Sequence, residues 1–307
     1  MTAPATDTAW VERTEAVATG IRRRVLKHVL DKGEGYMSQA CSSAEWLAML
    51  YTRVLRLAPV EAPLVTGEFP GVPGKDNPEY HTGAAVHGPP GPDYDRLVFS
   101  PAHYALSLYS VLIEVGRLDP ATLDDYNRDG STVEMIGAEH SPGFEVTSGS
   151  LAQALSQAAG IALGRKLKGE QGKVWVALSD GELEEGQTWE AVATAGFLGL
   201  DNLRVVIDAN GQQCDGLIDT VSSLEPMRER FLAFGASCDE VDGHDLLALD
   251  EAMGRPSDKP HVVIARTDPV RGVPLLAERA PKIHTLRLGN DEVERARYQA
   301  AYEAMLP

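Results

Sequence analysis

The chain has 307 residues, of which 43% are hydrophobic, and carries a formal net charge of −17 at pH 7. This apolar fraction is ordinary for a soluble globular protein, and the length suffices for one large α/β domain or two small ones. The acidic charge argues against nucleic-acid and anionic-membrane partners, because such partners would be repelled.

The three cysteines, Cys41, Cys214 and Cys238, show no CxxC spacing. Neither a disulfide framework nor a zinc site is therefore predicted. The first residues lack the basic and apolar regions of a signal peptide, and no window holds about eighteen uninterrupted apolar residues. We expect reduced thiols, a cytoplasmic location and no membrane-spanning segment.

Apolar residues at helical spacing predict an N-terminal helical segment over 8–31 and 42–57, with Ser42 and Ser43 as caps of the second helix. Residues 58–95 are rich in Gly and Pro and predict a long loop, which is most irregular near 60–95. Beyond it, strands are expected at 96–100, 173–180, 203–210, 236–243 and 260–267, and helices at 104–116, 149–169, 187–199, 224–234 and 291–306.

The predicted strands are hydrophobic throughout, which is typical of a parallel sheet with helices on both faces. The fold class is therefore α/β. Composition shows no break between residues 96 and 270, so we expect a single domain over residues 1–307.

Asp180 and Asn210 each end a predicted strand. In a parallel α/β sheet the ligand site lies beyond the carboxyl ends of the strands. A few oxygen ligands, with room for water and ligand phosphates, suit Mg²⁺. Alternatively, Asp180 caps the next helix and Asn210 occupies a turn.

The segments around these residues resemble the N-terminal, diphosphate-binding region of transketolase, a thiamine-diphosphate enzyme. The matching stretches are Ser179-Asp180-Gly181, Glu185-Gly186, Trp189-Glu190-Ala191, Asn210 and Asp215-Gly216. Several dissimilar residues at the right spacing make a strong signal. The segments GSLAQAL, VFSPAHYA, EVDGHD and PKIHTL extend the resemblance to most of residues 10–300.

The resemblance implies a site for thiamine diphosphate and Mg²⁺ (or Ca²⁺). Asp180, Asn210 and the main-chain carbonyl of Gln212 would hold the metal, and Gly181 would approach the diphosphate. Gly149 would accept a hydrogen bond from the aminopyrimidine through its carbonyl, and Leu151 would keep the cofactor bent.

His103 and His284 would donate to diphosphate oxygens or lie beside the reacting centre, although either imidazole could instead be structural. Glu185 and Glu190 match carboxylates that lie at a subunit interface in this family, in a network with the glutamate that activates the cofactor ring. Such crowded carboxylates have coupled pKa values. Glu182 and Glu184 are expected to be solvated charges at a helix start.

The resemblance also implies a partner. In transketolases the activating glutamate belongs to a pyrimidine-binding domain, which a C-terminal domain follows, and the 307 residues leave no room for either. We therefore expect a split enzyme in which a second subunit supplies both domains, in an α2β2 heterotetramer. Its reaction would transfer a two-carbon or acyl unit from a ketose or 2-oxo acid donor to an aldehyde-type acceptor.

Several positions depart from the family pattern. Tyr36 replaces a histidine expected near the donor hydroxyls, Gly137-Ala138-Glu139-His140 replaces Gly-His-Pro, and Ile283 replaces a tryptophan. Loss of such polar partners weakens sugar recognition. One alternative is therefore a subunit of a pyruvate-dehydrogenase-type 2-oxo acid decarboxylase, and a second is a non-catalytic cofactor-binding regulatory partner.

Overall fold

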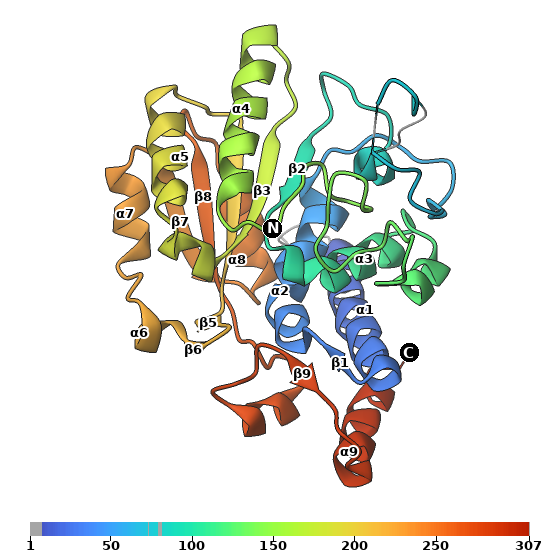
Figure 1. Ribbon diagram of the computed structural model, residues 1–307. Coiled ribbons are helices and arrows are strands. Elements are labelled where there is room, and N and C mark those ends of the chain that lie inside the picture. The colour runs from blue at the N-terminus through green and yellow to red at the C-terminus, as the bar shows by residue number, and fades with distance from the viewer. Residues whose placement is uncertain (1–7, 73, 79–81, 307) are drawn as a thin grey trace, which may run out of the picture.

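A computed structural model describes residues 8–72, 74–78 and 82–306, and its centre is a five-stranded parallel sheet (Figure 1). The strand order is β2-β3-β4-β8-β7. The strands are β2 (Arg96–Phe99), β3 (Val174–Ser179), β4 (Leu203–Ala209), β7 (Ser237–Asp242) and β8 (His261–Arg266). All five were expected from the sequence within one or two residues.

Helices cover both faces of the sheet (Figure 1). They are α1 (Ala9–Lys32), α2 (Met37–Met49), α3 (Ala105–Glu114), α4 (Gln153–Lys168), α5 (Gly186–Phe197), α6 (Ile218–Val221), α7 (Met227–Ala233), α8 (Leu246–Gly254) and α9 (Glu292–Glu303). Two short antiparallel pairs lie outside the sheet: β1 (Glu34–Gly35) with β9 (Leu286–Arg287), and β5 (Gln212–Gln213) with β6 (Gly216–Leu217).

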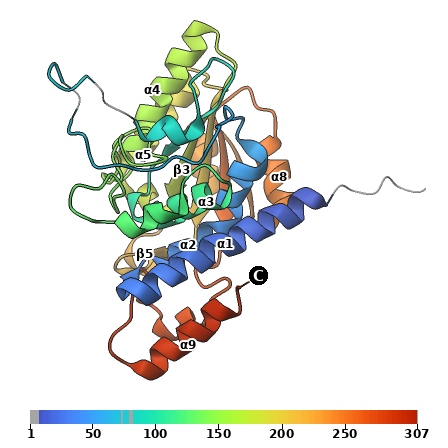
Figure 2. The same cartoon turned by 90° about the vertical axis from the view of Figure 1, so that its right-hand side faces the viewer.

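The N-terminal helix α1 packs on α2 and α3, and α9 packs on α1 on the side away from the sheet (Figure 2). The pairing of β1 with β9 joins the segment after α1 to the segment before α9, with Glu34 opposite Arg287. No helix in the described part of the chain is both long and apolar enough to cross a bilayer.

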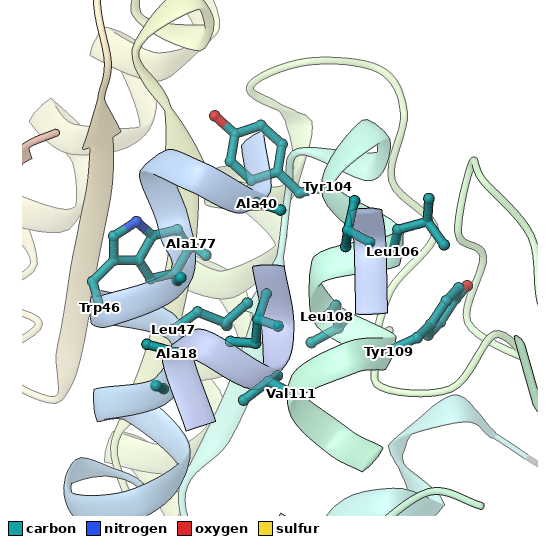
Figure 3. Packing of buried hydrophobic residues seen from close by; sticks show 14 of the residues in the cluster. Ala18, Ala40, Trp46, Leu47, Tyr104, Leu106, Leu108, Tyr109, Val111 and Ala177 are labelled. Carbon is teal, nitrogen blue, oxygen red and sulfur yellow. The ribbon is translucent and has the colours of Figure 1, made fainter. Parts of the chain in front are cut away.

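Side chains alternate along each strand between two apolar cores. Phe99 and Ala177 face α1, α2, α3 and α8, whereas Val98 and Val176 face α4, α5 and α7. Figure 3 shows part of the first core, where residues of α2 and α3 pack beside Ala177. Burial on both faces explains the continuous apolar runs and confirms the predicted α/β class.

Two predicted helix starts are wrong, each for a physical reason. The second helix begins at Met37, and Ser42 lies inside it, where its hydroxyl donates to Asp208 instead of capping the helix. The helix predicted from residue 149 begins at Gln153, because Gly149 has φ +102° and Ala152 has φ +69°. These left-handed residues form a turn before the helix.

The loop over residues 58–95 is held by a buried histidine. His87 lies in a short 3₁₀ turn, with Nδ1 3.0 Å from Glu145 Oε1 and Nε2 2.9 Å from the Tyr51 hydroxyl. Between this loop and the start of β2 lies a cavity of about 840 Å³. The cavity lies at the amino end of β2, at the opposite end of that strand from the predicted site.

Replacing His28 with Phe should make the chain less sensitive to mild acid. His28 is buried in α1 with its ring against Tyr126, and burial lowers its pKa from 6.5 to about 4. The unfolded chain therefore binds a proton first, so folding stability falls as pH drops from 6.5 towards 4. Urea unfolding of wild type and H28F should show this loss, of up to roughly 3 kcal/mol, mainly in wild type. Identical pH dependence in both would contradict it.

Candidate active site

The predicted metal ligands meet where the two central strands β3 and β4 end. The register pairs Ser179 with Asp208, so Asp180 and Asn210 both lie just past the sheet. The Asp180 carboxylate accepts from the backbone nitrogen of Gly211 at 2.7 Å and from that of Gly181 at 2.9 Å. It thereby ties the turn after β3 to the turn after β4.

Asn210 also has a local structural role. Its Oδ1 accepts from the backbone nitrogen of Gln212 at 2.9 Å, which closes an Asx turn. The side-chain oxygen Oε1 of Gln212 is buried and accepts no hydrogen bond from the described residues. The turn predicted for Asn210 as an alternative to metal binding is thus present. The cap predicted for Asp180 is not, because Ser179 is the N-cap of the 3₁₀ turn that follows β3. The side-chain oxygens of Asp180 and Asn210 each keep a lone pair free.

The donor set fits a cofactor-bound divalent cation. Burial, followed by the nearby Asp208 carboxylate, raises the pKa of Asp180 well above its usual range. A bound cation would offset both effects, because it favours the charged carboxylate. Among the described residues no three His, Cys, Asp or Glu side chains gather into a metal cluster. One carboxylate, one amide and one main-chain carbonyl therefore leave most positions to water and phosphate, as Mg²⁺ prefers.

The room beside Gly181 also suits a ligand. A Cβ added there would lie 3.7 Å from Gln213 Cβ, an ordinary contact, so packing within the chain does not require glycine at this position. Gly149 is different, because its φ of +102° favours glycine and a Cβ would lie 2.6 Å from Ile136 Cγ2. Leu151, two residues on, leaves 37% of its surface exposed.

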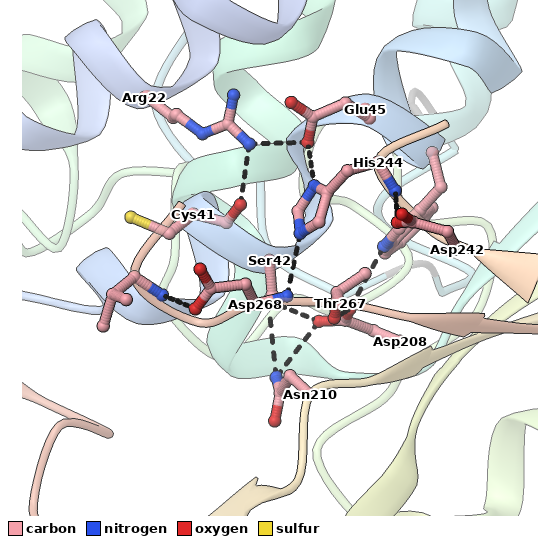
Figure 4. A network of polar contacts seen from close by, with 12 residues as sticks. Arg22, Cys41, Ser42, Glu45, Asp208, Asn210, Asp242, His244, Thr267 and Asp268 are labelled. Atoms are coloured by element: carbon pink, nitrogen blue, oxygen red, sulfur yellow. Dashed lines mark hydrogen bonds and ion pairs between the residues drawn. The ribbon is translucent and has the colours of Figure 1, made fainter. Parts of the chain in front are cut away.

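Asp208 is a central residue of the site that the motif comparison missed. Its buried carboxylate accepts from the hydroxyls of Ser42 (2.6 Å), Tyr104 (2.7 Å) and Thr267 (2.6 Å), and from the Asn210 amide (3.2 Å), as Figure 4 shows in part. Burial raises the pKa of Asp208, and these hydrogen bonds oppose that rise. A carboxylate inside the apolar run LRVVIDA was the signal available in the sequence.

His103 and His284 lie close to each other. Their ring centroids are 5.1 Å apart, and the Tyr36 ring packs edge-on against both at 5.6 Å. The network around Asp208 lies next to them, because Tyr104 is adjacent to His103 and its hydroxyl also accepts from Asn210 at 3.0 Å.

Both imidazoles are neutral at pH 7. Burial, together with the neighbouring His284, lowers the pKa of His103 to about 3, and burial lowers that of His284. Gln39 Nε2 lies 3.0 Å from His284 Nδ1. Because an amide nitrogen only donates, Nδ1 accepts and the ring proton is on Nε2. His284 can therefore offer one N–H donor to a ligand.

His140 does not join this pair. Its ring lies 4.3 Å from that of Phe69 in the long loop, and its Nε2 is 3.2 Å from Glu134 Oε2. Ile283 is buried. Tyr36 is therefore the substituted family position that touches both predicted site histidines.

The glutamates after β3 differ in solvent exposure, and one of them differs from the prediction. Glu182 was expected to be solvated, but it is fully buried: its carboxylate accepts from Ser100, Ser179 and the backbone nitrogen of Ala152. Glu184, Glu185 and Glu190 are exposed. The assignment of Glu185 and Glu190 to a proton-sharing network stays a prediction, and their exposure leaves them open to a partner chain.

A second polar network lies between the N-terminal helices and the loops at the carboxyl ends of β7 and β8. Glu45 accepts from Arg22 at 2.5 Å and from His244 Nδ1 at 2.8 Å, and His244 Nε2 accepts from the backbone nitrogen of Asp268 (Figure 4). Burial would raise the pKa of Glu45, but His244 and Arg22 together lower it to about 2. The network joins α1 and α2 to the loops after β7 and β8.

Residues 84–306 match the family profile described as the thiamine diphosphate binding domain of transketolase. A transketolase family protein of Sinorhizobium fredii, y4mO, is 35% identical over 280 residues, covering 90% of each chain. One of the subunits of the apulose-4-phosphate transketolase of Actinobacillus succinogenes is 30% identical, covering 93% of this chain and 95% of that one. The chain belongs to the transketolase family.

Solved structures show the same fold. The transketolase of Campylobacter jejuni superposes with a TM-score of 0.73 at 22% identity, covering 95% of this chain and 46% of that one. The Pichia stipitis enzyme in complex with sedoheptulose-7-phosphate gives a TM-score of 0.71 at 23% identity, covering 95% and 44%. The chain thus spans about half the length of the solved transketolases that it matches.

Replacing Asp208 with Asn should destabilise the chain. In either orientation of the new amide, its NH₂ group would face a group that can only donate, either Trp46 Nε1 or the Asn210 amide. Leaving buried donors unpaired costs about 1–3 kcal/mol. Urea unfolding of D208N beside the exposed control D258N measures this. An unchanged urea midpoint in D208N would show that the hydrogen bonds to Asp208 do not stabilise the ends of the two strands.

Proposed function

We propose that this chain is the diphosphate-binding subunit of a thiamine-diphosphate-dependent, transketolase-like transferase, with residues 1–307 acting as one cofactor-binding domain. The observation that carries the proposal is the meeting of Asp180, Asn210, the histidine pair and the turn at Gly149 at the carboxyl ends of the strands. This is where a parallel α/β sheet binds its ligand.

Each part of the site would have its own task. Asp180, Asn210 and the carbonyl of Gln212 would hold Mg²⁺, and Gly181 would leave room for the diphosphate. Bound thiamine diphosphate would supply a carbanion and an electron sink. His103 and His284, neutral and half-buried, would donate hydrogen bonds to the diphosphate or to the reacting carbonyl.

A partner chain would complete the enzyme. Relatives of nearly this length are named as transketolase subunits, among them the 6-deoxy-6-sulfo-D-fructose transketolase subunit SqwG of a Clostridium species, which is 30% identical over 82% of its length. We propose that a second subunit brings the pyrimidine-binding and C-terminal domains, in an α2β2 assembly. The chain alone would then be catalytically silent.

The donor is proposed to be a ketose, or a 2-oxo acid. Tyr36 gives the histidine pair an aromatic neighbour whose hydroxyl can donate one hydrogen bond. Because Tyr36 replaces the histidine that the family pattern places near the donor hydroxyls, it favours a donor with fewer recognised hydroxyls than ordinary transketolase substrates have. The transketolase family match makes the pyruvate-dehydrogenase-type alternative the weaker one.

The exposed face of α4 and α5 is the proposed docking surface for the partner. Phe197 is 89% exposed and Leu167 is 79% exposed, on helices that pack side by side. Gly160 and Gly164 leave open space above α4, so another backbone could approach closely. Glu190 lies on the same side of α5 as Phe197, seven residues earlier.

The function is tested by cofactor binding and by the identity of the partner. Calorimetric titration of the chain, with its co-purified partner, should show Mg²⁺-dependent binding of thiamine diphosphate. D180A should lose this binding by more than about 100-fold, since the metal loses its carboxylate, while the exposed control D219A keeps it. Binding without turnover alongside a companion that carries a pyrimidine-binding domain would favour the regulatory alternative. Unaltered binding in D180A would remove the metal assignment.

A charged residue at position 197, on the proposed docking surface, tests whether this surface binds the partner. F197D should weaken association with the partner on the order of thirtyfold, because an aromatic side chain that the partner would bury is replaced by an unpaired carboxylate. L247D is the matched control, since Leu247 is 66% exposed on α8, across the sheet. Sedimentation of mixed chains measures both. Equal weakening by the two substitutions would place the interface elsewhere.

A further inference from the structure

The buried carboxylate of Glu182 joins parts of the chain that are remote in sequence. It lies in the 3₁₀ turn Asp180–Glu184 after β3 and is fully buried. Oε1 accepts from the backbone nitrogen (3.0 Å) and hydroxyl (3.2 Å) of Ser179. Oε2 accepts from the hydroxyl of Ser100 and from the backbone nitrogen of Ala152 at 3.0 Å. One side chain thus connects the ends of β2 and β3 to the start of α4.

Each connected segment carries a predicted site residue. Ser100 comes three residues before His103, Ser179 comes directly before Asp180, and Ala152 follows Leu151. A Cβ at Gly149 would also lie 3.9 Å from Ala102 Cβ, so the turn over 149–152 packs beside the segment that carries His103. The position of Glu182 therefore sets how the turn lies relative to Asp180 and His103.

Ala152 is in a conformation that a non-glycine residue rarely adopts. Its φ of +69° crowds the Cβ atom against its own backbone, which costs about tenfold in the population of that conformation. The hydrogen bond from its backbone nitrogen to Glu182 holds the residue there, in a fully buried position. Without that acceptor the turn would relax to a different shape.

We infer that Glu182 is a positioning residue that fixes the 149–152 turn for the aminopyrimidine half of the cofactor. This inference rests on the proposed function, and it goes beyond it by assigning a role to a residue that touches neither metal nor diphosphate. Asp180 and Asn210 keep their own bonds to Gly211 and Gln212, none of which involves Glu182. The two halves of the cofactor therefore depend on different groups.

Glu182→Gln is the variant that tests the role. The carboxylate faces a backbone N–H on each side, so a glutamine must turn its own NH₂ group against one of them. Ser179 ends a central strand, whereas Ala152 lies in a loop. The turn at Ala152 will therefore be the segment that moves. Hydrogen exchange on the full chain should show the Ala152 amide exchanging at least about tenfold faster in E182Q than in wild type or in the exposed control E184Q.

Binding of two probes to the chain with its partner separates positioning from general support. With Mg²⁺ present, E182Q should bind thiamine diphosphate about tenfold more weakly and inorganic pyrophosphate within about threefold of wild type. The double variant A152G/E182Q should regain about threefold in cofactor affinity, because glycine adopts positive φ without strain.

The outcomes are distinct. Equal loss of both probes, unchanged binding of both, or no change in exchange at Ala152 would each overturn the positioning role. Failure of the double variant to regain affinity would overturn the part assigned to strain at Ala152. If wild type binds pyrophosphate and the cofactor equally, or binds neither, the proposed function itself fails, and the inference fails with it.

Discussion

The structure depends on the parallel register of β3 and β4. Because Ser179 lies opposite Asp208, the two strands deliver Asp180 and Asn210 to the same edge of the sheet, and the Asp180 carboxylate closes the gap by bonding to the Gly211 nitrogen. Two apolar cores, one on each face, hold that register. A one-residue slip would exchange the cores and separate the two side chains.

This arrangement buries three carboxyl groups, and hydrogen-bond donors of the chain stabilise them. Asp208 and Glu182 each accept from several hydroxyl, amide or backbone groups, and Asp180 accepts from two backbone nitrogens. Burial raises the pKa of all three carboxyl groups. A divalent cation beside Asp180 would favour the charged form of that carboxylate and so oppose the effect of burial.

In the histidine pair, burial acts on the pKa in the opposite direction. His103 and His284 are half-buried with the Tyr36 ring against both of their rings, and their lowered pKa values keep them neutral. A neutral imidazole donates a single hydrogen bond without adding charge, so the pair can orient a ligand without changing the charge of the site. The Tyr36 ring makes this cluster more aromatic than the family pattern implies.

By itself the sequence determined the fold class, the five strands, the residues that follow β3 and β4, and the family, because apolar runs and motif spacing are local properties of the chain. It also suggested that His103 and His284 share a site, through resemblance alone. Only the tertiary structure decided the role of Glu182, whose partners Ser100 and Ala152 lie 82 and 30 residues away. Burial of a glutamate, strain at Ala152 and the donors around Asp208 arise from packing between remote segments, and no local pattern encodes them.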